Sequence, residues 1–391
     1  MTAVRGATTI VVGGGILGAT TACELARAGM DVLLLEARRF GEQSTGKSAA
    51  IVRGHYSNPE VVRMAVHSRE TLRRLPLLLE CDPVYTRTGW LFLVDAENAA
   101  FALDNAEMQD EEGLDTVEVD DLQEYVPGID ETGIAYALYE PDAGFADPVA
   151  TTNAYIATAR LAGARALENT AVETVELEGD RIRGVRLAGE LVECDNLVLA
   201  AGPWTPKLAA GAGLELPIEI TREQDVVFET SPEETLAPAV SSQIDRIYMR
   251  PAPEYGSTHL LVGRGFPKEY EIVDPSAYSG AVDGAFELDV RERVTGRIPR
   301  LEGMRRIDGR VGLYDVTPDW HPILGAVDGH EGLFLATGGS GHCFKLGPAI
   351  GEMVAGDVLG LKTPYADVRN FSLSRFAEGR EFRSTYGGNR A

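Results

Sequence analysis

The 391-residue chain has few cysteines, few lysines and no long apolar run. No apolar stretch reaches the ~18 residues that a membrane-spanning helix requires, so we expect no membrane span. The N-terminus leads almost at once into the first predicted strand, so we expect no signal peptide. The four cysteines lack metal-like spacing, which predicts reduced thiols, a cytoplasmic protein and no metal site.

Positive charge is scarce as well. The chain has 60 Asp and Glu against 36 Lys and Arg, which gives a formal net charge of -24, and lysine supplies only five of the bases. A dispersed acidic surface argues against nucleic acid as a partner. Two explanations stay open: a halophilic source whose salt screens the self-repulsion, and a GC-rich genome with an acidic proteome.

A glycine-rich turn between an apolar strand and a helix is the strongest local signal. Residues 8–12 predict a buried parallel strand, and residues 16–28 predict a helix packed on it. Gly13, Gly15 and Gly18 fit the dinucleotide fingerprint, in which they permit a tight turn, a pyrophosphate approach and close helix–strand packing. Glu36 ends the next apolar run, where a carboxylate binds a ribose diol. This motif does not separate FAD from NAD.

Two later segments repeat a strand followed by glycine. Residues 196–200 predict a buried strand that ends in Ala201, Gly202 and Trp204, and residues 332–337 predict a strand followed by a glycine loop and a helix through about residue 359. The last unit lies at the far end of the chain from the first. The cofactor domain is therefore expected to be discontinuous, and a long FAD suits it better than NAD.

The length predicts two domains. We expect an α/β fold: a Rossmann-like FAD-binding domain, discontinuous over 1–85, 148–215 and 311–372, and an α+β substrate domain with a mixed β-sheet over 86–147 and 216–310. Residues 373–391 are expected to form a frayed tail. Helices are expected at 58–80, 96–112 and 148–166, a strand at 86–94 and a hairpin within 168–191.

Five segments together resemble the D-amino-acid-oxidase superfamily of flavoproteins: 13–18 with Glu36, 44–59, 197–204, 312–319 and 338–352. Within it the chain is similar to the sarcosine oxidase β-subunit, monomeric sarcosine oxidase and dimethylglycine dehydrogenase group. The resemblance covers nearly the whole chain and is weak between residues 90 and 300. It implies an FAD enzyme that oxidises the C–N bond of a small N-methylated or D-amino acid. Hydride passes to flavin N5, and the resulting imine hydrolyses.

The resemblance also implies the substrate-binding residues. Arg53 and Lys345 match the two cations that hold the substrate carboxylate, and the scarcity of lysine independently favours a role for Lys345. Tyr248 matches a pocket tyrosine that bonds the carboxylate or orients the amine, although an ordinary half-buried strand tyrosine is an equal alternative. The further pocket candidates are Arg250, Tyr314, Leu261 and His342.

The residues expected to bind FAD are Gly13, Gly15, Ile16, Leu17, Gly18, Glu36, Ala37, Arg38, Ser44, Thr45, Lys47, Ser48, Ala49, Ala50, Val172, Ala201, Gly202, Trp204, Gly339, Ser340, Gly341, His342 and Lys345.

Three departures from the pattern bear on the chemistry. Gly312 stands where monomeric sarcosine oxidase carries its cysteine tether, and Lys47 stands where dimethylglycine dehydrogenase carries its histidine tether, so FAD is expected to be noncovalent. Leu261 stands where the oxidase has an oxygen-activating lysine. This favours a dehydrogenase that passes electrons to a carrier over an oxidase that uses O2.

Two other functions remain open. One is an FAD-dependent 2-hydroxy-acid oxidoreductase, which the same two cations would serve. The other is a subunit of a hetero-oligomeric amine oxidase or dehydrogenase complex, with partner subunits.

Overall fold

The structure is a computed structural model that describes residues 4–232, 236–266 and 268–384. Within these ranges the first sheet consists, in pairing order, of β20 (Ile323–Ala326), β21 (Leu333–Thr337), β13 (Asn196–Leu199), β1 (Thr9–Val12), β2 (Val32–Leu35) and β9 (Arg165–Leu167). Neighbouring strands are parallel, except that β20 is antiparallel to β21.

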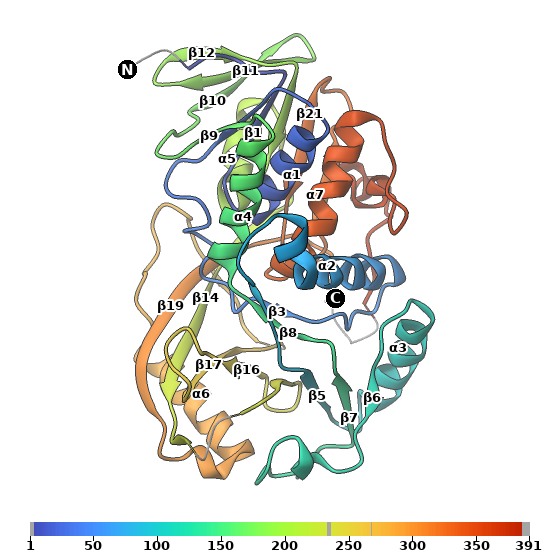
Figure 1. The fold of residues 1–391 in the computed structure, drawn as a ribbon, viewed down its shortest axis with the longest axis vertical. Coiled ribbons are helices and arrows are strands. Elements are labelled where there is room, and N and C mark those ends of the chain that lie inside the picture. The colour runs from blue at the N-terminus through green and yellow to red at the C-terminus, as the bar shows by residue number, and fades with distance from the viewer. Residues whose placement is uncertain (1–3, 233–235, 267, 385–391) are drawn as a thin grey trace.

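Both faces of the first sheet are covered (Figure 1). One face packs on α1 (Ile16–Arg27), α4 (Pro148–Leu161) and α7 (Cys343–Leu359). The other packs on α5 (Thr205–Gly211) and on the antiparallel strands β10 (Thr174–Glu178), β11 (Arg181–Leu187) and β12 (Glu190–Glu193). The strands are therefore mostly apolar, because consecutive residues point to opposite buried faces.

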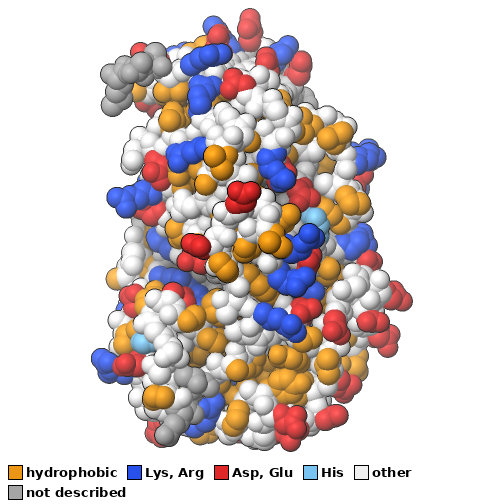
Figure 2. All heavy atoms as spheres, viewed as in Figure 1, with side chains coloured by type: hydrophobic (Ala, Val, Ile, Leu, Met, Phe, Trp, Pro, Cys, Tyr) orange, Lys and Arg blue, Asp and Glu red, His pale blue; other side chains and the backbone are white. Residues whose placement is uncertain are grey.

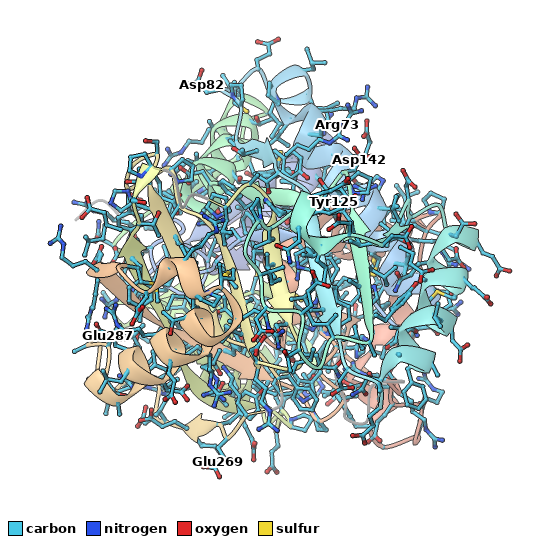
Figure 3. All side chains as sticks on the ribbon, turned by 90° about the horizontal axis from the view of Figure 1, so that it is seen from below. Arg73, Asp82, Tyr125, Asp142, Glu269 and Glu287 are labelled. Atoms are coloured by element: carbon cyan, nitrogen blue, oxygen red, sulfur yellow. The ribbon has the colours of Figure 1, made fainter. Side chains whose placement is uncertain are left out.

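The large sheet consists, in pairing order and within the described ranges, of β18 (Glu271–Ile272), β14 (Glu219–Glu229), β17 (His259–Arg264), β16 (Ile247–Pro251), β15 (Ala239–Ser242), β5 (Trp90–Val94), β7 (Tyr136–Glu140) and β6 (Val117–Glu118), with β19 (Arg305–Val316) paired to β14. The helix α6 (Gly284–Arg297) covers one face through Val290 and Val294. Figure 3, seen from below, shows this helix against the large sheet, with Glu287 labelled beside it. The opposite face of β14, β16 and β17 is left to face the site described below.

The remaining elements join these two layers. A small sheet pairs β8 (Gly144–Ala146) with β3 (Ile51–Val52) and β4 (Tyr85–Arg87). The helix α2 (Pro59–Leu78) packs against α7, and α3 (Ala99–Glu111) precedes β6. Short 3-10 helices cover Leu122–Glu124, Gly202–Trp204, Pro299–Leu301, Val368–Phe371 and Leu373–Arg375. At the start of α2 the side chain of Asn58 accepts hydrogen bonds from the first-turn N–H groups, as the Asn-Pro signal predicts.

We propose that the first and the large sheet are the cores of the two domains. Strands from 90–140 and from 219–316 build the large sheet, in keeping with the two expected substrate-domain segments. The expected boundary at residue 311 falls inside β19, which runs from one region of the fold into the other (Figure 1).

Two predicted elements differ from those observed. The predicted strand 86–94 is broken at Gly89, whose φ of +74° and lack of a Cβ let the chain pass the Tyr139 side chain, so β4 and β5 join different sheets. The predicted helix 148–166 ends at Leu161. Gly163, with φ of +102°, turns the chain, and β9 then adds to the first sheet beside β2.

Two residues of the expected frayed tail, Arg375 and Phe382, pack against the rest of the chain, and the prediction is wrong at these positions. Arg375 is completely buried and its Nε donates to Asp319 Oδ2 over 2.8 Å. Phe382 stacks on the His321 ring with centroids 4.4 Å apart. From the sequence alone, Arg375 cannot be told from an exposed residue of a polar tail, because its buried partner Asp319 lies 56 residues earlier in the chain. The rest of the expected tail, 385–391, lies outside the described residues.

In the part of the chain that the structure describes, no helix is long and apolar enough to cross a membrane. Over the same residues no group of three or more His, Cys, Asp or Glu side chains could hold a metal ion.

Candidate active site

A cavity of about 580 Å³ opens at the carboxyl ends of β1, β2 and β13, and we call it the long cavity. Its walls come from the glycine turn after β1, the segment 36–48, residues 170–173, the turn after β13 and the second glycine loop before α7. The carboxyl edge of parallel strands is where α/β sheets bind ligands. Segments from both ends of the chain meet here, as the repeated strand–glycine pattern predicts.

The glycine turn has the close contacts that its sequence predicts. A Cβ at Gly13 would lie 2.3 Å from the Ala200 carbonyl oxygen, and a Cβ at Gly18 would lie 1.9 Å from the Gly13 carbonyl oxygen. Gly18 therefore sets the contact between α1 and β1 and does not line the cavity. The Glu36 carboxylate accepts hydrogen bonds from the N–H groups of Gly14 over 2.7 Å and Arg38 over 2.8 Å, which holds the turn in place.

The long cavity has the groups that an FAD dinucleotide would require. The helices α1 and α7 begin at its wall, and neither has an acidic residue in its first turn, so both dipoles remain available to an anion. Ser44 Oγ lines this wall, is buried and has no hydrogen-bond partner among the described residues. A buried hydroxyl without a partner is costly unless a ligand satisfies it. The residues present therefore fit FAD.

A second cavity of about 250 Å³ adjoins the first, and we call it the short cavity. The two share Ser48, Tyr314, Gly341 and Phe344 as lining residues. The charged side chains on its wall are Arg53, Arg264, Lys268 and Lys345, and the aromatic ones include Trp90, Phe92, Phe266 and Trp320. No Asp or Glu is among its described lining residues. This cavity therefore favours an anionic ligand.

Arg53 and Lys345 both line the short cavity, as the resemblance implies. Lys345 Nζ donates to the Tyr56 hydroxyl over 3.1 Å, and the Arg53 guanidinium lies 5.0 Å from the Tyr56 ring centre. Across residues 4–232, 236–266 and 268–384, neither cation forms an ion pair with a carboxylate. Burial, and then the nearby Arg53, lower the pKa of Lys345 well below its usual range. A bound carboxylate would supply the missing counter-charge.

Buried charges hold the segment that carries Arg53. The Gly54 N–H lies 2.9 and 2.8 Å from the two Glu140 carboxylate oxygens. Arg69 Nη1 donates to Glu140 Oε1 over 2.6 Å, and the Glu140 side chain is completely buried. Glu140 and Arg69 therefore fix the backbone next to Arg53.

Tyr248 and Tyr314 lie on the same side of the large sheet and both line the short cavity. The Tyr248 hydroxyl donates to Asp225 Oδ1 over 2.6 Å. Tyr314 also lines the long cavity, so it stands at the junction of the two. Its ring lies directly over Gly341, where a Cβ would come within 2.1 Å of it.

His342 lines the short cavity but is engaged at both ring nitrogens. Nε2 lies 2.6 Å from the Trp320 carbonyl oxygen, and Nδ1 lies 3.3 Å from the Tyr56 hydroxyl oxygen. Burial, and then the nearby Lys345, lower the pKa of His342 well below its usual range. The ring is therefore a neutral bridge between two walls of the cavity.

Two pocket candidates, Arg250 and Leu261, do not line either cavity, and the expectation that they do is wrong. Arg250 is buried, with its Nε donating to the Ala49 carbonyl oxygen over 2.6 Å and its Nη2 donating to Glu254 over 2.6 Å. Leu261 packs with Val227 under Ala49. Both lie on the face of the sheet that carries Tyr248, but they pack against Ala49 and do not reach the opening.

The expected FAD residues separate into three groups by position. The long cavity is lined by Gly13, Gly15, Ile16, Leu17, Glu36, Ala37, Ser44, Thr45, Ser48, Val172, Ala201, Gly202, Trp204, Gly339 and Gly341. The short cavity takes Ala49, Ala50, Ser340, His342 and Lys345, with Ser48 and Gly341 in common. Gly18, Arg38 and Lys47 line neither. The prediction that these three residues bind FAD is therefore wrong. Gly18 lets α1 pack on β1, and Arg38 donates its main-chain N–H to Glu36. Lys47 Nζ donates to the Tyr278 hydroxyl over 3.3 Å.

Several lining residues were not among those predicted from the sequence. Arg39 and Lys207 line the long cavity, and Lys268 and Gln243 line the short one. Lys268 is paired to Glu223, whereas Gln243 Oε1 is buried with no partner among the described residues. Lysine scarcity alone would have drawn attention to Lys207 and Lys268.

Backbone strain is concentrated at the short cavity. Ala50, Trp320 and Ser340, all lining residues, have φ of +51°, +62° and +46°. Such conformations cost about 1–3 kcal/mol each and persist where the surrounding structure imposes them, commonly at functional sites.

Comparison with known proteins agrees with this geometry. A family model described as FAD-dependent oxidoreductase, the DAO family, matches residues 8–356. The chain therefore belongs to this family, and the predicted fold class and FAD dependence are confirmed.

Individual relatives lie at moderate distance. The chain is 28% identical over 383 residues to 4-methylaminobutanoate oxidase (formaldehyde-forming) of Paenarthrobacter nicotinovorans, covering 93% of this chain and 45% of that protein. It is 27% identical over 380 residues to monomeric sarcosine oxidase of Bacillus sp. (strain B-0618), covering 94% and 95%. The solved structure of L-proline dehydrogenase from P. horikoshii matches with a TM-score of 0.88 and 29% identity, covering 97% and 100%.

Proposed function

We propose that the chain oxidises the C–N bond of a small secondary amino acid, using FAD. The observation that carries this is the pair Arg53 and Lys345, two cations without carboxylate partners among the described residues, in a cavity that adjoins the long one. The names of the three relatives support it, because 4-methylaminobutanoate, sarcosine and L-proline each combine a carboxylate with a secondary amine.

Each part of the chain has a definite task in this proposal. The glycine turn at 13–18, Glu36 and Ser44 would hold the dinucleotide, and the start of α7 would face the flavin. FAD, when bound, supplies the acceptor for the two electrons that leave the C–N bond. Arg53 and Lys345 bind the carboxylate and so orient the amine, and the aromatic wall excludes water.

We favour a dehydrogenase over an oxidase. The argument from Leu261 does not support this, because Leu261 lies outside both cavities while Lys268 lines the short one. The similarity to L-proline dehydrogenase, at 29% identity over nearly the full length of both chains, does support it. Reduced enzyme that reoxidises slowly in air but rapidly with an artificial acceptor would agree. Rapid formation of peroxide would overturn the preference.

The substrate class can be tested by flavin bleaching without oxygen. We expect sarcosine, 4-methylaminobutanoate or L-proline to reduce the flavin, and D-alanine and 2-hydroxyglutarate to do so more slowly. The double variant Arg53→Met/Lys345→Met should keep FAD and lose saturable bleaching, because the carboxylate has lost both charged partners. Unchanged bleaching in that variant would contradict the assignment.

The alternatives give different results in the same experiment. Bleaching by hydroxy acids in preference to amines would favour the 2-hydroxy-acid oxidoreductase. Failure of the isolated chain to bleach with any substrate, together with partner subunits that co-purify with it, would favour a subunit of a larger complex.

FAD is proposed to be noncovalent. Gly312 and Lys47 stand at the two positions where members of the family carry the residue that binds flavin covalently. Burial raises the pKa of the Cys343 thiol, which keeps this cysteine of the long cavity in its unreactive protonated form. Precipitation with acid should leave the yellow colour in the supernatant. Colour retained in the protein pellet would contradict this.

A further inference from the structure

Adjacent strands of the large sheet place Arg310, Asp225, Gly263 and Tyr248 in one row. Asp225 on β14 pairs with Arg310 on β19 and with Gly263 on β17, and Gly263 pairs with Tyr248 on β16. Residues paired in this way have their side chains on the same face of a sheet. That face is opposite α6, and at Tyr248 the row reaches the wall of the short cavity.

Gly263 provides the space that lets Tyr248 reach Asp225 across β17. A Cβ at position 263 would lie 2.3 Å from the Tyr248 hydroxyl oxygen and 2.4 Å from Asp225 Oδ1. Any larger residue would separate the two groups, which now lie 2.6 Å apart. The contact between the Tyr248 hydroxyl and the Asp225 carboxylate therefore depends on the glycine at position 263.

The second carboxylate oxygen of Asp225 is also occupied. Arg310 Nε donates to Asp225 Oδ2 over 3.2 Å, and Arg310 Nη2 donates to the Ser48 carbonyl oxygen over 2.9 Å. Ser48 lines both cavities. Arginine has donors only, so the atom that faces Arg310 has to be an oxygen.

We propose that Asp225 is a positioning residue that accepts the Tyr248 O–H and so leaves the Tyr248 oxygen as an acceptor for the N–H of a neutral secondary amine in the short cavity. This inference rests on the proposed function. The amine is held neutral because cations and no described carboxylate line the cavity. Tyr248 would then orient the nitrogen while Arg53 and Lys345 hold the carboxylate.

The charges around Tyr248 keep its phenol protonated. The titratable groups that raise its pKa are Asp225, Tyr314 and Glu223, and the Tyr314 hydroxyl is in hydrogen-bonding contact with the Tyr248 hydroxyl. Arg310 on β19 bonds Asp225, and Lys268 in the loop after β17 pairs with Glu223. Burial, and then Asp225, raise the pKa of Tyr248 well above its ordinary value. The hydroxyl therefore keeps its proton for Asp225 at neutral pH.

The test is a double-mutant cycle with Asp225→Asn in the wild-type and Tyr248→Phe backgrounds. In Asp225→Asn the amide oxygen has to face Arg310, so the amide N–H faces Tyr248 and turns its O–H toward the cavity. We expect the second-order rate of anaerobic flavin reduction to fall about tenfold in the wild-type background and less than about twofold in Tyr248→Phe. Equal losses in both backgrounds would overturn the proposal, because Asp225 would then act through the fold alone.

A second measurement does not depend on Asp225→Asn folding. Tyr248→Phe should weaken binding of a secondary amino acid about tenfold and leave its N-methylated tertiary counterpart unchanged, because a neutral tertiary amine has no N–H. Sarcosine and N,N-dimethylglycine are such a pair, with binding followed by the flavin spectrum. Equal effects on both ligands would overturn the proposal. If the preference for the secondary over the tertiary amine were lost only in Gln243→Leu, the N–H would be bound by Gln243 and the proposal would also fail.

The controls separate this inference from the proposed function. Asp283→Asn breaks an ion pair to Arg222 on the same strand, away from both cavities, and should leave flavin reduction unchanged. Tyrosinate absorbance near 295 nm needs no substrate: in the difference between each protein and its Tyr248→Phe counterpart, Asp225→Asn should lower the pH at which Tyr248 ionises. If no amine bleaches the flavin but this shift appears, the proposed function fails and the hold of Asp225 on Tyr248 stands. Absence of the shift would overturn the inference.

Discussion

At the scale of single residues, Lys345 shows how the protein prepares for an anion. The lysine is buried beside Arg53, bonded to the Tyr56 hydroxyl, and has no carboxylate partner in the described chain. Its pKa is lowered, by burial first and by Arg53 second. An amine in this state is ready to take up a proton when a carboxylate arrives, because the new negative charge stabilises the charged form.

Carboxylate binding should therefore be linked to proton uptake. In the pH range above the lowered pKa of free Lys345 and below its pKa in the complex, affinity should fall as pH rises. Calorimetric titration with a carboxylate that carries no amine, in buffers of different ionisation enthalpy, would measure the protons taken up. Lys345→Met should bind more weakly and lose the linkage, and a linkage that survives in this variant would contradict the assignment to Lys345.

At the scale of elements, the glycines of the first turn have separable tasks. Gly18 sets the distance between α1 and β1, since a Cβ there would lie 1.9 Å from the Gly13 carbonyl oxygen. Gly15 begins α1 and faces the long cavity, and a Cβ there would meet only Thr45 Oγ1, at 3.0 Å. Gly18 thus serves the packing of helix on strand, and Gly15 serves the ligand.

Alanine substitution at the two positions should separate these tasks. Gly18→Ala should lower the unfolding free energy by about 1–3 kcal/mol or more, because the helix has to move off the strand. Gly15→Ala should change stability by less than about 1 kcal/mol and weaken FAD binding about tenfold or more, because the added methyl occupies the approach of the pyrophosphate. Denaturant unfolding of the apoprotein and fluorescence titration with FAD measure the two. Similar losses of stability in both variants would refute the separation.

At the scale of the whole molecule, the net charge of -24 is spread over the surface. Figure 2 shows acidic and basic side chains interspersed on one face, with acidic ones gathered over α3. That helix, Ala99–Glu111, carries acidic residues and no Lys or Arg. Such a distribution opposes the compact state by self-repulsion where salt is low.

Thermal unfolding should therefore depend on salt if the acidity reflects a salt-rich cytoplasm. The Debye length falls from ~10 Å at 0.1 M to ~3 Å at 1 M, which screens most repulsion between exposed carboxylates. We expect the midpoint of thermal unfolding to rise across this range in KCl. A flat or falling midpoint would leave the GC-rich genome as the explanation of the acidity.

The local sequence accounts for much of the fold because its signals depend on near neighbours. Strand–glycine–helix units, the Asn58 cap and the hairpin around residue 179 all appear where their residues predict. The local sequence fails to predict the secondary structure where a contact with a residue far away in the chain decides it. Gly89 breaks a strand because Tyr139 lies against it, and the strand β9 forms because β2 offers it a partner.

The glycine turn, Glu36 and the pair Arg53 and Lys345 were within reach of the sequence. Motif spacing marks the glycine turn and Glu36, the scarcity of lysine marks Lys345, and the family resemblance marks Arg53. Only the tertiary structure decided the rest. It removed Arg250 and Leu261 from the pocket and buried Arg375 against Asp319. It also placed Asp225 beside Tyr248 across a glycine, since rows across a sheet are set by strand pairing and leave no trace in the order of the chain.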